Sequence, residues 1–138
     1  MVNEEYCSFG TAKLLKEKGF DEPCYMSYHE TNKDYEIGHD AGHTNSMFEE
    51  FYKKDGVMNY SAPTLQMAMR WLREVHNLYL QIMLDSWALG SHSGYYVVIQ
   101  RIDSDCEMML QDALDEVFYK TYEEACEAAI KYCLENLI

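Results

Sequence analysis

The chain has 138 residues, of which 48% are hydrophobic and 25% are charged. This length fits one domain, and the apolar content excludes a disordered chain. Its 24 acidic residues against 11 basic ones give a formal net charge of -13, which disfavours direct binding to nucleic acid. We therefore expect a single domain over residues 1–138 that binds another protein, with homo-oligomers left open.

The five cysteines are odd in number, and no two have the C-x-x-C spacing of a redox or metal motif. The opening MVNEEYCSFG lacks the basic and apolar segments of a secretion signal. No apolar run reaches the ~20 residues that a membrane span needs. These observations predict a cytoplasmic protein with free thiols, no membrane contact and no cofactor.

The first part of the chain predicts two short helices around a hairpin. Ser8 is placed to cap a helix through SFGTAKLLKEKG, and Gly19 is placed to end it. CYMSYHE and KDYEI have the composition of two short paired strands. Residues 38–45 are rich in glycine and polar side chains, which predicts a loop. Ser46 and Glu49 then form a capping box, which predicts a short helix from about Met47 to Lys54.

The stretch SAPTLQMAMRWLREVHN predicts the first main helix, over residues 64–75. Ser61 is a suitable N-cap, and Pro63 falls in the first turn, where its missing N–H costs nothing. The apolar residues that recur at helical spacing, and are therefore expected to face a core, are Leu65, Ala68, Leu72 and Val75.

After Asn77 the apolar period changes to alternation, which predicts a half-buried strand over Leu78–Leu84. DSWALGSHSG has the composition of a loop, and YYVVIQRI predicts a second strand over Tyr95–Ile102. Strands joined by a short connection usually pair, so we expect an antiparallel hairpin here.

Two alternatives fit DSDCEMMLQDALDEV. Ser104 and Glu107 form a capping box before apolar residues at helical spacing, which favours a helix. The segment Glu107–Gln111 would serve equally as a third strand of the meander. The sequence alone leaves both open.

The last segment predicts the second main helix, over residues 122–136. Thr121 and Glu124 form a capping box. One continuous apolar stripe follows, made of Tyr122, Ala125, Cys126, Ala129, Ile130, Cys133, Leu134 and Leu137. The expected fold is therefore α+β: an antiparallel sheet with two main helices packed on one face, plus a short N-terminal helix.

Three segments resemble one family. SAPTLQMAMRWLREVHN, KTYEEACEAAIKYCLENLI and TAKLLKEKGFDEPCY are similar to signatures of short uncharacterised proteins from Bacteroides-type gut bacteria and from their phages and mobile elements. The resemblance covers a little over a third of the chain and implies an accessory protein inside the cell. It implies no catalytic residue, because the matching segments are those expected to form the core.

A metal site is one hypothesis for the motif GHDAGH. His39 and His43 are four residues apart, with Asp40 beside the first, a spacing that zinc sites use on helices. The position after the first histidine holds aspartate where the zinc motif has glutamate, and the two glycines disfavour a helix. An exposed polar loop is the competing interpretation, and we favour it.

The expected interaction surface lies on the second hairpin, at Trp87, His92 and Tyr79. Trp87 lies outside any amphipathic pattern, so it either folds back onto the core, which we expect, or anchors an interface. Tyrosine, which occurs 12 times, is enriched at interfaces but is also an ordinary packing residue.

Three functions compete. The first is a non-enzymatic protein-interaction module of a phage or mobile element, which we favour because the sequence shows no catalytic constellation. The second is a metal-binding protein or hydrolase using His39 and His43. The third is an inhibitor that imitates nucleic acid with its acidic surface and blocks a basic host protein. Because the acidic residues are spread along the chain, we expect them to serve solubility.

Overall fold

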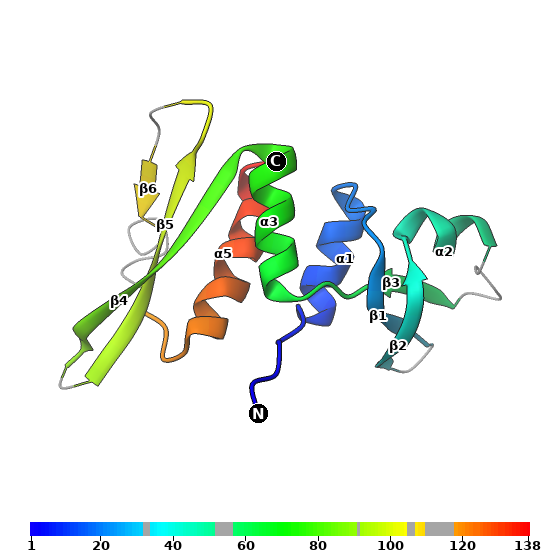
Figure 1. The fold of residues 1–138 in the computed structure, drawn as a ribbon, viewed down its shortest axis with the longest axis horizontal. Coiled ribbons are helices and arrows are strands. Elements are labelled where there is room, and N and C mark those ends of the chain that lie inside the picture. Colours follow the sequence, from blue (N-terminus) through cyan, green and yellow to red (C-terminus); the bar gives the residue numbers. More distant parts are fainter. Residues whose placement is uncertain (32–33, 52–56, 91, 105–106, 110–117) are drawn as a thin grey trace. The chain divides into compact units, whose positions relative to one another are not determined.

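The computed structural model describes residues 1–31, 34–51, 57–90, 92–104, 107–109 and 118–138. The chain divides into two compact units, Met1–Thr64 and Leu65–Ile138. Each unit combines helices with a three-stranded antiparallel sheet, which confirms the α+β class and the short N-terminal helix (Figure 1). One domain over residues 1–138 stays a prediction. In the part of the chain that the structure describes, no helix is long and apolar enough to cross a membrane.

Helix α1, Phe9–Glu17, opens the first unit and begins and ends as predicted. The Thr11 N–H donates to Ser8 Oγ over 3.3 Å, so Ser8 caps the helix. Gly19 follows the helix with φ of 90°, a conformation that glycine adopts without strain. Leu15, on the inner face of the helix, is fully buried.

The sheet of the first unit has β1 (Cys24–Glu30) at its centre. On its two sides lie β2 (Tyr35–His43) and β3 (Met58–Ser61), both antiparallel to it. The expected hairpin is confirmed, but β2 continues to His43, so the loop predicted over 38–45 is wrong. Pairing with β1 supplies the hydrogen bonds that outweigh the low strand propensity of the glycines.

Helix α2, Asn45–Phe51, begins earlier than the capping box predicts. The Met47 N–H donates to Thr44 Oγ1 over 3.2 Å, so Thr44 provides the cap. The Ser46 backbone N–H and hydroxyl both donate to the Asp21 carboxylate, each over 2.7 Å. The prediction of Ser46 as the cap is therefore wrong, because Asp21 engages it.

The two faces of this sheet differ in character. On one face the Phe9 ring of α1 lies 5.5 Å from the ring of Tyr28 and 5.6 Å from that of Tyr60, centroid to centroid. Because neighbouring strand residues point to opposite faces, Ser27 and Asn59 belong to the other face. Ser27 is fully buried and Asn59 is 9% exposed, so this polar face is covered as well.

The second unit begins with α3, Leu65–His76, close to the range predicted for the first main helix. Ser61, the predicted cap, lies in β3 and is buried there, so that prediction is wrong. Trp71 is buried in the helix, whereas Val75 is 54% exposed. The helix therefore turns its Trp71 side to the core, where the Trp71 ring lies 4.6 Å from the His76 ring.

The sheet of the second unit has the order β4-β5-β6. Its strands are β4 (Leu78–Leu89), β5 (His92–Arg101) and β6 (Glu107–Met109). The predicted pairing is confirmed, with Leu78 opposite Arg101 and Leu84 opposite Tyr95. The loop predicted over DSWALGSHSG is wrong, because both strands extend into it.

Strand β6 pairs with β5 and agrees with the strand alternative for Glu107–Gln111. Residues 105–106 and 110–117, on which the helix alternative depended, lie outside the described residues.

Helix α5, Tyr122–Asn136, confirms the second main helix. The Glu124 N–H donates to Thr121 Oγ1 over 3.1 Å, so the predicted cap is correct. The buried residues of α5 are Ala125, Cys126, Ala129, Ile130, Cys133 and Leu134, all members of the predicted stripe. Figure 1 shows α3 and α5 beside each other, on one side of the β4–β5 hairpin.

Candidate functional site

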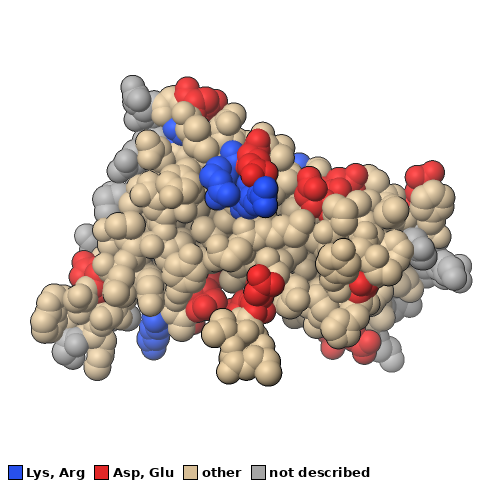
Figure 2. Space-filling model, viewed as in Figure 1, with Lys and Arg blue, Asp and Glu red and all other residues tan. Residues whose placement is uncertain are grey.

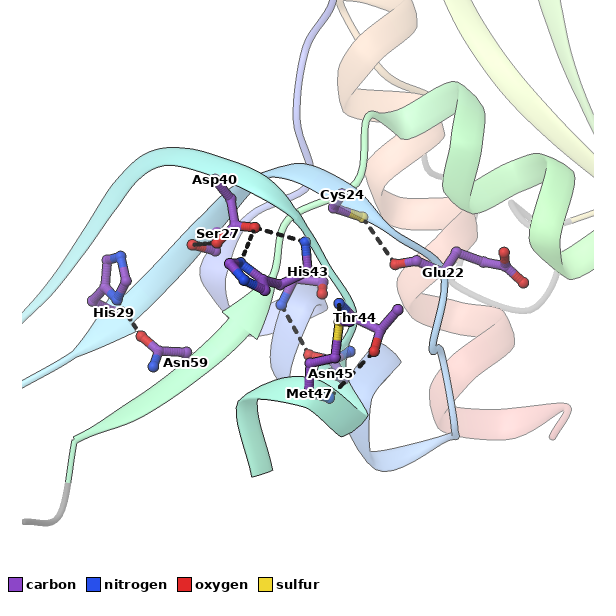
Figure 3. Close-up of polar contacts among 11 residues, drawn as sticks. Glu22, Cys24, Ser27, His29, Asp40, His43, Thr44, Asn45, Met47 and Asn59 are labelled. Atoms are coloured by element: carbon purple, nitrogen blue, oxygen red, sulfur yellow. Dashed lines mark hydrogen bonds and ion pairs between the residues drawn. The ribbon is translucent and has the colours of Figure 1, made fainter. Parts of the chain in front are cut away.

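The polar face of the first sheet brings together Asp40 and His43 of β2 and Ser27 of β1 (Figure 3). One carboxylate oxygen of Asp40, Oδ1, lies 2.7 Å from His43 Nδ1 and accepts the His43 backbone N–H over 2.8 Å. The other, Oδ2, accepts from Ser27 Oγ over 3.3 Å. The Asp40 side chain is only 8% exposed, and that of His43 is 24% exposed. The carboxylate therefore fixes the orientation of the imidazole.

Cys24 lies opposite His43 in the strand ladder, but its thiol is not poised for nucleophilic attack. Burial raises the pKa of Cys24 to about 12, and the nearby Ser61 hydroxyl opposes this only in part. The Cys24 Sγ donates to the Glu22 carbonyl oxygen over 3.6 Å. Because the thiolate is the reactive form, Cys24 is inert at neutral pH.

The geometry gives the hypothesis of a metal site at His39, Asp40 and His43 no support. These residues lie on a strand and not on a helix, and His39 is exposed. His29, the histidine of the neighbouring strand β1, is hydrogen-bonded to Asn59. Within the described residues, no group of three or more His, Cys, Asp or Glu side chains could hold a metal ion. The site remains a prediction.

An open cavity of about 460 Å³ lies in the first unit, at the end of α1 and the start of α2. Its lining includes Lys16, Glu49, Asp21 and Ser46. Lys16 Nζ lies 2.6 Å from Glu49 Oε1, and Asp21 accepts the hydrogen bonds of Ser46. These polar groups bond to one another, so they hold α1 and α2 together.

The tip of the β4–β5 hairpin presents the most exposed tryptophan among the described residues. Trp87 is 72% exposed, so the expectation that it folds back onto the core is wrong. The backbone N–H of Trp87 donates to Asp85 Oδ1 over 2.8 Å, at the point where the strand register is irregular. The Gly90 N–H donates to the Trp87 carbonyl over 3.2 Å, and Gly90 makes the turn with φ of 78°. This local backbone directs the indole away from the core.

The three predicted interaction residues lie on this one hairpin. His92 is exposed across the turn, opposite Leu89. Tyr79, nearer the start of β4, is 43% exposed. Figure 2 shows the far end of the hairpin, at the lower left, as mainly uncharged surface. The tip therefore offers aromatic and apolar contacts more than charge.

Sequence reasoning missed two exposed residues of β4. Met83 is 40% exposed and Leu84 is 57% exposed, near the end of the strand that was predicted to be half-buried. The reason is visible in Figure 1, where the hairpin extends beyond α3 and α5. The length of the apolar segment from Leu78 to Leu89 could have indicated this exposure, because so long a strand extends past the helices that cover it.

Comparisons with protein-family models, curated proteins and solved structures found no match.

Proposed function

We propose that this protein is a non-enzymatic module that binds another protein through the tip of the β4–β5 hairpin. The observation that carries the proposal is the 72% exposure of Trp87 at that tip. Burying an exposed indole releases water from a large apolar surface, and tryptophan is enriched among residues that dominate binding energy. His92, which is exposed across the turn, would contribute polar contacts beside it.

The Asp40–His43 pair supports an enzymatic function less well. It provides an oriented imidazole, as hydrolases use, but the described residues around it offer no activated nucleophile. The Ser27 hydroxyl donates to Asp40, and the Cys24 thiol is protonated at neutral pH. The pair is better explained as the polar support of β2.

The cellular setting is part of the proposal. The family resemblance favours an accessory protein of a phage or mobile element in a Bacteroides-type bacterium. Among the described residues, Cys24, Cys126 and Cys133 are buried and form no disulfide, which supports a reducing, cytoplasmic location. The partner would then be a protein of the host cell or of the element itself.

The test is capture of a partner from a Bacteroides-type lysate with the tagged protein, followed by affinity measurements with purified components. We expect Trp87→Ala to weaken binding by about 2 kcal/mol or more, which is roughly thirtyfold. Tyr25→Ala is the matched control, because Tyr25 is also 72% exposed but lies on β1. A partner that binds Trp87→Ala as tightly as the natural chain would refute the proposal.

A further inference from the structure

We infer that the free edge of β4 pairs with β4 of a second copy of this chain, forming a closed two-fold dimer. The two sheets β4-β5-β6 would then join edge to edge. This inference goes beyond the hairpin tip, because it rests on the segment Leu78–Leu84 and not on Trp87. It also implies that the dimer presents two tips.

The first observation is an accessible strand edge. Among the strands described, β4 is hydrogen-bonded to β5 alone, and an edge strand directs alternate N–H and C=O groups outward. Its register with β5 runs without a bulge from Leu78 to Asp85. Tyr79, Met83 and Leu84 are 43%, 40% and 57% exposed. Charges, prolines and bulges usually block such edges, and Leu78–Leu84 contains no charged residue and no proline.

The second observation is that the segment LYLQIML is complementary to itself. In antiparallel pairing about a two-fold axis at Gln81, each residue meets its counterpart at equal distance on the other side. The facing pairs would be Gln81 with Gln81, Leu80 with Ile82, Tyr79 with Met83, and Leu78 with Leu84. Every pair matches in polarity, and the two amides can hydrogen-bond across the axis.

The charge distribution favours a second copy of this chain over other partner strands at the β4 edge. A chain of net charge -13 repels a second copy over most of its surface, but no like charges meet along Leu78–Leu84. A basic partner strand would find no carboxylate in the segment to pair with. An uncharged strand of the same pattern fits best, and the chain itself supplies one.

The first experiment measures the mass of the full chain by sedimentation and light scattering, from roughly 1 μM to 1 mM. We expect a species of twice the 16.2 kDa of one chain. Gln81→Lys should weaken the dimer roughly tenfold or more, because two ammonium groups would meet at the axis. Gln100→Lys is the matched control, since Gln100 contacts Gln81 on the same sheet but lies on the central strand β5.

The dimer should also tighten as salt rises, because salt screens the repulsion between two acidic chains. A second measurement tests the register by disulfide formation under mild oxidation. Gln81→Cys should cross-link two copies rapidly, since residues facing each other in antiparallel strands lie within disulfide range. Gln100→Cys should not.

A natural chain that stays monomeric at every concentration would overturn the inference. So would equal dimerisation of Gln81→Lys and the natural chain, or equal cross-linking at positions 81 and 100. Trp87→Ala should dimerise normally, so loss of partner binding and loss of the dimer are separable.

Discussion

Strands β2 and β4 are both edge strands of three-stranded antiparallel sheets, yet their edges differ. β2 carries Glu36 and Asp40, two glycines, and an irregular register with β1 between the His39 and His43 pairs. β4 has regular pairing and no charge from Leu78 to Leu84. Charge and irregularity protect a strand edge from added strands, so the β2 edge disfavours pairing with another strand and the β4 edge favours it.

The two strands also rest on different supports. β4 lies against α3 and α5, whose buried residues are almost all apolar. The Asp40 carboxylate of β2 accepts a hydrogen bond from Ser27 of β1, and it also accepts from His43 at the end of β2 itself. The support of β4 is therefore mainly apolar, whereas that of β2 adds a polar contact at Asp40 to the strand pairing with β1.

The largest expected effect is the loss of the support of β4. A chain ending at Tyr119 lacks α5, which buries six of its residues against the rest of the second unit. Each large aliphatic side chain stabilises by ~1.5–3 kcal/mol on burial, and a small domain has ~5–15 kcal/mol in total. We expect the truncated chain to lose its cooperative melting transition in the second unit.

Hydrogen exchange makes this prediction specific to one strand. The amides of Leu78–Leu84 should lose protection in the truncated chain, and those of Cys24–Glu30 should keep more of theirs. Undiminished protection of β4 without α5 would show that the helix is not part of its core.

Much of this fold could be predicted from the sequence where local signals and packing agree. Thr121 caps α5, as its local sequence predicts. The apolar residues at helical spacing are also the residues that the helix buries, so local pattern and tertiary packing agree. The β4–β5 pairing follows in the same way from alternation and a short connection.

The predictions were wrong where residues distant in sequence determine the bounds of a helix or strand. The sequence does not show that Asp21 engages Ser46, so the start of α2 was misplaced. The extension of β2 to His43 depends on β1, and GHDAGH alone has the composition of a loop. The Asp40–Ser27 contact and the exposure of Leu84 likewise arise from tertiary structure.

The next effect concerns the polar support of β2. Asp40→Ala removes the acceptor of three hydrogen bonds and leaves the groups of Ser27 and His43 without it. A hydrogen bond to a charged group contributes about 1.5–3 kcal/mol, so we expect a loss of at least that order in the free energy of unfolding. Urea denaturation would measure it. Glu36→Ala, an exposed change on the same strand, should change stability little; equal losses would contradict the proposed support.

A smaller effect is expected at His76, where α3 leads into β4. Burial lowers the pKa of His76, and its Nε2 has no hydrogen-bond partner among the described residues. The unfolded chain therefore takes up the proton more readily than the folded one. The stability that neutral His76 contributes is present above about pH 6.5 and is lost as the pH falls through the lowered pKa.

Urea melts at several pH values would detect this, with His76→Gln as the control that removes the contribution. The natural chain should lose more stability than the variant between neutral and mildly acidic pH. An NMR titration that places the His76 pKa at or above its ordinary value would contradict it.

The smallest expected effect is the response of partner binding at Trp87 to salt. Exposed charges are screened beyond about 8 Å at physiological ionic strength, so steering by acidic groups would make association slow as salt rises. The hairpin tip is mainly uncharged, and within each unit the acidic side chains in view form separate groups (Figure 2). We therefore expect the association rate with a captured partner to change little with salt, which stopped-flow or surface-binding kinetics would measure. A steep decline would show that the net charge of -13 guides a basic partner, and that solubility is not its sole role.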